Sequence, residues 1–249
     1  MPGSSWPMLS TGLFYSIDIG PIHFVTLNTE VFFSQKEQLD SQLKWLKEDL
    51  QKANSRRESH PWIIVLGHRP MYCSLTNNSQ LPSNDKKEDD ECLIVRTKLE
   101  NILFEEGVDL YIAGHQHNYE RSWPVYKGTA FHRNYINPKA PIHIVNGAMG
   151  YQYIVDDFKG LQPAWSAVRL CNKEKELYGK LEVLNSSHLA WEVYAAENNA
   201  LEDSILIVQH QHGSFGKSGN HKLIFSLLPD LKTTSHFKIL GKVLSVACL

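Results

Sequence analysis

Apolar residues in the first part of the chain alternate between short compact runs and one amphipathic stretch. Residues 14–19 and 23–28 are rich in β-branched and aromatic side chains, and Gly20-Pro21 between them is typical of a turn, so we predict a β-hairpin. Residues 35–53 predict a helix, because four leucines recur on one face with lysine and glutamate between them. These leucines are Leu39, Leu43, Leu46 and Leu50.

Two continuous apolar runs follow, at residues 62–66 and 108–113, and a glycine comes directly after each. Such runs predict strands buried on both faces, as in a parallel sheet. Residues 94–106 between them predict a helix, whereas residues 74–92 are polar and predict a loop whose acidic run at 88–91 is solvated. The order of strand, helix and strand indicates an α/β fold.

After residue 140 the pattern becomes that of a β-rich region. Further strands are predicted at 141–147, 178–184, 189–195 and 204–209. Residues 217–249 follow three closely spaced glycines, hold one short apolar patch and predict a loosely attached tail. We expect Trp165 and Trp191 to be core residues.

Charge and composition exclude several classes of protein. The chain has 249 residues with 25 basic and 27 acidic side chains, a net charge of −2, which argues against a general nucleic-acid binder. No apolar run is long enough to span a membrane, so we predict no transmembrane helix. The first six residues show neither a basic nor an apolar region, so we expect no signal peptide there. Nothing in the sequence sets an oligomeric state.

Histidines stand directly after the two buried strands. His68 follows the first strand, and His115 and His117 follow the second, each strand ending in glycine. Because ligands bind beyond the carboxyl ends of parallel strands, and neutral imidazole binds zinc and iron well, these residues predict a metal site. His115 and His117 point the same way if the segment is extended and then serve two neighbouring ions. A lone histidine at such a position more often only forms hydrogen bonds.

The four cysteines form no CxxC pair, so a thiolate zinc site is not expected. Cys73 and Cys92 flank the acidic loop and either form a disulfide, in an oxidising compartment, or remain free thiols. Asn77 and Asn185 begin glycosylation sequons, and Asn185 is the better candidate because it lies in a turn between two predicted strands.

The histidine motifs carry a family resemblance. Val65-x-x-His68 and Gly114-His115-x-His117 resemble the last two of five motifs of the purple acid phosphatases, a family of calcineurin-like metallophosphoesterases, and are closest to the long animal and plant-like type. The sequence around both motifs is similar as well, and the resemblance covers residues 1–216. The resemblance implies part of a two-sheet αββα sandwich. It divides the chain into the second half of the metallophosphoesterase domain at 1–138, a C-terminal region at 139–216 and a divergent tail at 217–249.

The resemblance also implies a chemistry. Family members hold Fe(III) beside a divalent ion (Zn, Fe or Mn) and hydrolyse phosphate monoesters with a metal-bound hydroxide. His68 and His115 would bind the divalent ion and His117 the iron. The resemblance further implies a secreted or lysosomal glycoprotein. Glu120 and Arg121, which continue the second motif, would form a local salt bridge or support the histidine loop.

The sequence departs from the family in the motifs that supply carboxylates. Asp18-Ile19-Gly20 matches the first motif by letters but lies in the predicted hairpin, and Gly219-Asn220-His221 matches the third but follows the histidines. Three of the family's seven ligands remain, so the centre is incomplete. The family's proton-donating histidines correspond to Asn77 and Asn78, so no catalytic acid is assigned. The chain is then a C-terminal portion of an acid phosphatase. Three alternatives stay open: the chain is an active phosphatase, it is a non-catalytic fragment with an uncovered apolar sheet face, or it is a module that binds a single zinc ion through the three histidines.

Overall fold

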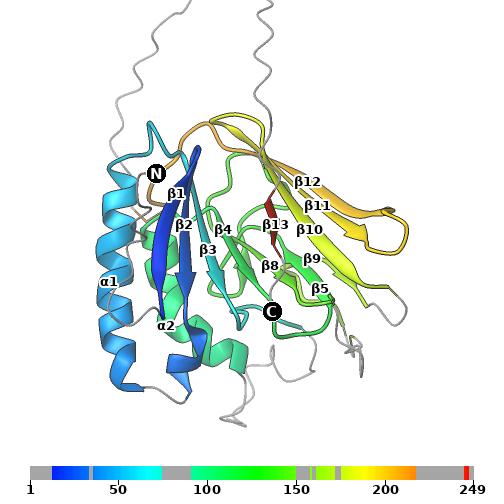
Figure 1. Cartoon of the computed structure of the whole chain (residues 1–249), viewed down its shortest axis with the longest axis horizontal. Helices are drawn as coiled ribbons and strands as arrows, with labels where there is room; N and C mark the ends of the chain where they lie inside the picture. Colours follow the sequence, from blue (N-terminus) through cyan, green and yellow to red (C-terminus); the bar gives the residue numbers. More distant parts are fainter. Residues whose placement is uncertain are drawn as a thin grey trace, which may run out of the picture.

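A computed structural model describes residues 13–33, 36–74, 91–149, 158, 161–171, 175–216 and 244–246 (Figure 1). Several predicted features lie outside these residues: the sequon at Asn77, the position of Asn78, residues 88–90 of the acidic run, Gly219-Asn220-His221, and the tail from 217 onward apart from 244–246.

Seven strands form the larger sheet, in the order β1-β2-β3-β4-β8-β5-β9. The predicted hairpin is confirmed, since β1 and β2 pair antiparallel, and β2, β3, β4 and β8 then run parallel. On the far side, β5 pairs antiparallel with both β8 and β9. The bounds are β1 Tyr15–Ile19, β2 Ile22–Leu27, β3 Trp62–Gly67, β4 Leu110–Ala113, β5 Tyr119–Ser122, β8 Ile142–Asn146 and β9 Ser166–Leu170.

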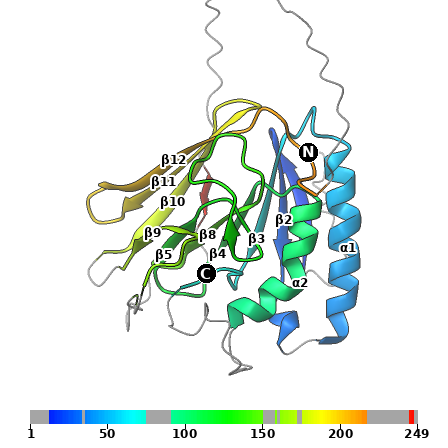
Figure 2. The same cartoon turned by 180° about the vertical axis from the view of Figure 1, so that it is seen from behind.

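Two helices cover one face of this sheet (Figures 1 and 2). Each provides the crossover that parallel strands require: α1, Lys36–Asn54, joins β2 to β3, and α2, Glu91–Glu105, joins β3 to β4. Their apolar faces pack on the sheet through side chains such as Leu46, Leu50 and Leu99, all fully buried. A short 3₁₀ helix, η1 (Thr29–Phe32), follows β2. No described helix is long and apolar enough to cross a membrane.

A second sheet packs on the opposite face of the first (Figure 1). Its order is β12-β11-β10-β13, with bounds β10 Leu177–Val183, β11 His188–Ala195, β12 Leu201–Val208 and β13 Leu244–Val246. Buried and partly exposed positions alternate along β10 and β11, as one buried face requires. The uncovered apolar face that truncation predicted is absent from the described β10 and β11, because their outer face carries Lys180 ion-paired with Glu182 and Glu192.

Both predicted core tryptophans are buried, Trp165 against the helices and Trp191 between the sheets. A two-stranded ribbon, β6 (Val125–Tyr126) with β7 (Thr129–Ala130), completes the described elements. The fold is therefore a mixed α/β architecture with a β-rich C-terminal region, as predicted.

Candidate functional site

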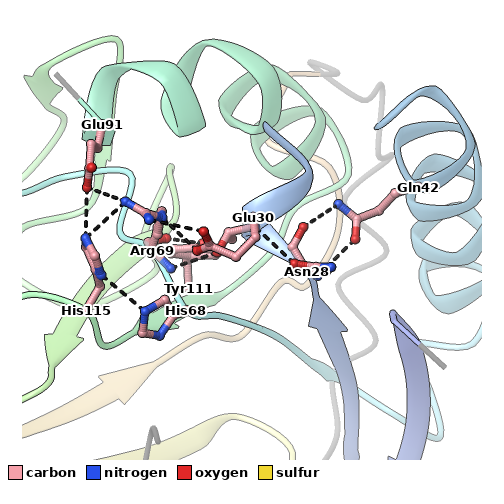
Figure 3. Close-up of polar contacts among 9 residues, drawn as sticks. Asn28, Glu30, Gln42, His68, Arg69, Glu91, Tyr111 and His115 are labelled. Carbon is pink, nitrogen blue, oxygen red and sulfur yellow. Dashed lines mark hydrogen bonds and ion pairs between the residues drawn. The ribbon is translucent and has the colours of Figure 1, made fainter. Parts of the chain in front are cut away.

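His68 and His115 lie together at the carboxyl end of the parallel strands. β3 and β4 are neighbours, so the residues that follow them meet at one edge of the sheet. The His115 Nδ1 and the His68 Nε2 are 3.1 Å apart, and the ring centroids are 4.9 Å apart (Figure 3). The Gly114 backbone N–H also donates to the His68 carbonyl, at 3.1 Å. The structure thus places one histidine of each motif at the same point.

The backbone of the second motif is tightly turned. His115 has a φ of 63°, in the left-handed region that non-glycine residues rarely adopt, so the segment is not extended. The condition under which His115 and His117 were expected to point the same way, an extended segment, is therefore not met at His115. The loop also packs closely against Gly147. A Cβ added at that position would lie 2.3 Å from the Gln116 carbonyl oxygen, so the loop leaves no room for a side chain there. Strained backbone of this kind persists where surrounding contacts enforce it, as at many functional sites.

A carboxylate and a guanidinium hold the other side of the His115 ring. The His115 Nε2 lies 2.8 Å from the Glu91 Oε2, and Arg69 donates to the same oxygen (Figure 3). Arg69 also donates to both oxygens of Glu30, at 2.7 and 3.1 Å. Glu91 was predicted to lie in a solvated loop. That prediction is wrong because α2 begins three residues earlier than expected and brings Glu91 to the site.

Arg69 is itself fixed from several directions. Its N–H donates to the Thr29 Oγ1, and its carbonyl accepts from the Tyr111 hydroxyl. Its guanidinium lies 4.4 Å from the centre of the Phe33 ring. Gly67 is required beside it, because a Cβ there would lie 2.4 Å from the Tyr111 hydroxyl oxygen. The segment that carries His68 is therefore rigidly placed.

Glu30 is positioned by the start of η1. The Asn28 side chain caps this short helix by accepting from the Glu30 N–H at 3.0 Å. The Gln42 side chain of α1 in turn accepts from the Asn28 N–H and donates to its carbonyl (Figure 3). Sequence reasoning missed Glu30, although Asn28 followed by a helical turn was a signal for a capped terminus.

The charges around the pair favour a neutral His68 ring. Burial is the largest cause that lowers the pKa of His68, and electrostatic interactions with His115, Arg69 and His117 lower it further, whereas Glu30 acts to raise it. Burial alone would raise the pKa of Glu91, but its hydrogen bonds with His115 and Arg69 lower it overall. A neutral imidazole and an ionised carboxylate are the forms that metal sites use.

The pair fits two positions around one ion. Two nitrogens bound at the usual zinc–nitrogen distance are about 3.0 to 3.4 Å apart, and the observed separation is 3.1 Å. Glu91 contacts the His115 Nε2, the ring nitrogen that faces away from His68. A carboxylate on the nitrogen that does not bind the metal commonly orients ligating histidines. However, no group of three His, Cys, Asp or Glu side chains able to hold a metal occurs in the described part of the chain, so His117 does not complete such a group. The described residues fit part of one site and do not make a binuclear centre.

Asp18 lies at the opposite end of the sheet. It pairs with His23, which follows the turn at Gly20, whereas His68 follows the far end of β3. Its carboxylate contacts His23 at 2.6 Å and Arg56 at 2.9 Å. Asp18, which matches the family's first motif by letters, therefore has a structural role and is not a ligand at the histidine site.

Glu120 and Arg121 do not pair with each other, so the predicted local salt bridge is wrong. Successive residues of a strand point to opposite faces, and each finds a distant partner. Glu120 accepts from the Ser74 N–H at 2.8 Å and from the Ser166 hydroxyl at 2.6 Å. Arg121 donates to both oxygens of Asp203, at 2.7 and 2.8 Å.

Two further predictions concern the cysteines and the sequon at Asn185. Cys73 and Cys92 form a disulfide with Cα atoms 6.3 Å apart. Asn185 is exposed in the turn between β10 and β11, where its side chain accepts from the Ser187 N–H at 2.9 Å. Its glycosylation stays a prediction.

Comparisons with known proteins match most of this chain. A family model described as calcineurin-like phosphoesterase matches residues 4–119, and one described as iron/zinc purple acid phosphatase-like protein C matches residues 140–204. Human acid phosphatase type 7 is 35% identical over 218 residues, which are 84% of this chain and 49% of that protein. Purple acid phosphatase 18 of Arabidopsis thaliana is 32% identical over 73% of this chain and 36% of its own length. The chain thus spans about half the length, or less, of these curated relatives.

Two solved structures share the fold. Purple acid phosphatase PPD1 from yellow lupin seeds superposes with a TM-score of 0.63 at 23% identity, covering 79% of this chain and 32% of its own. GAP50, described as the anchor in the inner membrane complex of Plasmodium, superposes with a TM-score of 0.53 at 18% identity, covering 80% of this chain and 54% of its own. These two structures show the fold alone, whereas the two family models and the relatives above 30% identity show that the chain belongs to the purple acid phosphatase family of calcineurin-like phosphoesterases.

Proposed function

We propose that this protein is a metal-dependent acid phosphatase that hydrolyses phosphate monoesters, and that His68 and His115 bind its divalent ion. The observation that carries the proposal is the 3.1 Å separation of the His68 Nε2 and the His115 Nδ1 at the carboxyl end of β3 and β4. The relatives are named acid phosphatases, which supports the same reaction class.

The chain's own residues would act by binding and orientation. His68 and His115 would bind the ion through the two facing nitrogens, while Glu91 keeps the His115 ring turned toward His68. Arg69 sits between Glu30 and Glu91 and balances their charge. When bound, a divalent ion supplies electrostatic stabilisation of the phosphate and a water of lowered pKa.

A binuclear centre is the finer form of this proposal. In it, His117 serves a neighbouring Fe(III), and carboxylates beyond the described residues neutralise the two ions. Such carboxylates are required because two adjacent cations repel strongly unless anionic ligands offset their charge. On this proposal the chain is a portion of a longer phosphatase.

Secretion or a lysosomal location is proposed on separate grounds. A disulfide such as Cys73–Cys92 persists in an oxidising compartment, and Asn185 offers an exposed glycosylation site.

Activity of the metal-loaded chain tests the proposal. The purified protein is loaded with Fe(III) and Zn²⁺ and assayed with p-nitrophenyl phosphate at acid pH. We expect hydrolysis that the substitution His115→Ala abolishes and the substitution His132→Ala, at an exposed histidine of a loop, leaves unchanged. Stoichiometric metal binding without hydrolysis would overturn the phosphatase proposal.

That outcome would favour a second candidate, a non-catalytic module with a single-metal histidine site. One observation supports it: the described residues offer two imidazoles at ligand spacing and no third donor grouped with them. The shared fold with GAP50, described as an anchor, is in keeping with a binding role on this scaffold. A stoichiometry of one zinc without iron would support this candidate.

A further inference from the structure

Glu91 reaches the histidine pair from α2, an element that follows β3 only after a long connection. We propose that Glu91 is a positioning residue that fixes the orientation of the His115 ring, and that the Cys73–Cys92 disulfide holds Glu91 in place for this task. The metal-binding purpose of that orientation rests on the proposed function, whereas the positioning itself does not.

Glu91 is poorly secured by its own helix. It is the first residue of α2, where backbone N–H groups have no partner within the helix and the first turn frays easily. Its side chain is 44% exposed, so packing does not hold it. Among the residues that the structure describes, its carboxylate contacts Arg69 and His115. A further restraint on the helix start is needed to keep the carboxylate at the ring.

The disulfide supplies that restraint. Cys92 is next to Glu91 in the first turn of α2, and both cysteines are buried. Cys73 belongs to the segment after His68 in which Met71 and Tyr72 are almost fully buried in the core. The bond therefore ties the start of α2 to the most rigid part of the site, across a sequence separation of 19 residues.

The same segment is anchored to the histidine loop on its other side. Ser74, next to Cys73, donates its N–H and its hydroxyl to Glu120. Glu120 is 2% exposed and lies in β5, which follows the His115 loop directly. These contacts form a continuous series. It runs from the His115 loop through Glu120 and Ser74 to the disulfide, and from the disulfide through Glu91 back to the His115 ring. Breaking this series of contacts at the disulfide or at Glu91 removes the carboxylate from the ring, which retains its contacts with Arg69 and His68 but is less firmly oriented.

Acylation of His115 by diethyl pyrocarbonate tests the inference in metal-free protein. This reagent attacks an unprotonated ring nitrogen, and mass spectrometry separates His115 from His117, with exposed His132 as internal reference. We expect Glu91→Ala to raise the His115 rate about fivefold relative to His132, because a hydrogen bond to the ring is lost. Glu91→Gln, which keeps an acceptor, should lie between wild type and Glu91→Ala. The matched control is Glu105→Gln at the exposed end of the same helix, which should leave the rate unchanged.

A mutant cycle tests the role of the disulfide. Replacing both cysteines by serine should raise the His115 rate as Glu91→Ala does, and combining the changes should add nothing further, because both act through one contact. If the serine variant does not fold, folded wild-type protein is treated with a phosphine instead. The phosphine reduces the disulfide to two thiols and is itself oxidised to the phosphine oxide. An unchanged rate in Glu91→Ala, or additive effects in the cycle, would overturn the inference. No phosphatase turnover enters the test, so failure of the proposed function is seen separately.

Discussion

A histidine clamped between two aspartates ties the edge hairpin to α1, and its loss should destabilise the protein most at acid pH. His23, on β2, is 2% exposed. Its Nδ1 lies 2.6 Å from the Asp18 Oδ1 on β1, and its Nε2 lies 2.8 Å from the Asp49 Oδ2 on α1. Carboxylates only accept hydrogen bonds, so both ring nitrogens must carry protons and the ring is an imidazolium.

The magnitude follows from these two contacts. Hydrogen bonds to charged groups contribute about 1.5 to 3 kcal/mol each, so His23→Gln, which cannot satisfy both carboxylates, should cost about 3 kcal/mol near pH 5.5. For a chain of this size that free energy corresponds to a fall in Tm of roughly 6 to 12 °C.

The pH dependence has a definite sign. Burial alone would lower the pKa of His23, but the hydrogen bonds to Asp49 and Asp18 raise it above the usual value. The stabilisation is therefore complete below about pH 6.5 and is lost as the pH rises through the folded-state pKa. The other titratable groups nearby are Lys52 of α1, Arg56, which follows α1 and pairs with Asp18, and His60, whose Nε2 lies 3.9 Å from the Asp18 Oδ2.

Urea unfolding at about pH 5.5 and about pH 8.5 checks this prediction. The difference in unfolding free energy between wild type and His23→Gln should shrink at the higher pH. His132→Gln, at an exposed position, is the control. A difference that is independent of pH would refute the assignment of an imidazolium.

Three further perturbations have defined outcomes. Gly179→Ala should lower the unfolding free energy by about 1 to 3 kcal/mol in urea, because a Cβ there would lie 2.2 Å from the buried Trp191 ring; an unchanged midpoint contradicts this. Replacing Cys73 and Cys92 by serine should cost about 3 kcal/mol by the same assay, and a cost near zero would show that the bond constrains little. Burial lowers the pKa of His143 to about 3, so wild type should lose about 1.4 kcal/mol per pH unit from this residue as the pH falls from about 6 to 4. His143→Phe should remove that slope, and an unaltered slope would contradict the burial argument.

The parts of the fold with a strong local pattern could be predicted from sequence. The hairpin, α1 and the buried strands β3 and β4 were predicted within a few residues, because their apolar periodicity matches the face that they bury. The pairing of β3 with β4 followed from the strand, helix, strand order and placed His68 beside His115.

The missed features depend on partners far apart in the sequence. β5 carries Glu120 and Arg121 at buried positions, which no hydrophobic pattern reveals. Glu120 bonds Ser74, 46 positions away, and Arg121 bonds Asp203, 82 positions away. Glu91 stood in an acidic run typical of a loop, and only the tertiary contacts with Arg69 and His115 show its place. The left-handed backbone of His115 is likewise a conformation that its residue type does not favour locally, and the residues on either side of it, Gly114 and Gln116, pack against Gly147.

Calorimetric titration of the metal-free chain with Zn²⁺ tests most directly whether the facing nitrogens of His68 and His115 form a metal site. The pair predicts that binding weakens at least about 10-fold in His68→Ala and in His115→Ala, while His132→Ala binds as wild type does. Equal zinc affinity in all four proteins would contradict the metal role of the pair.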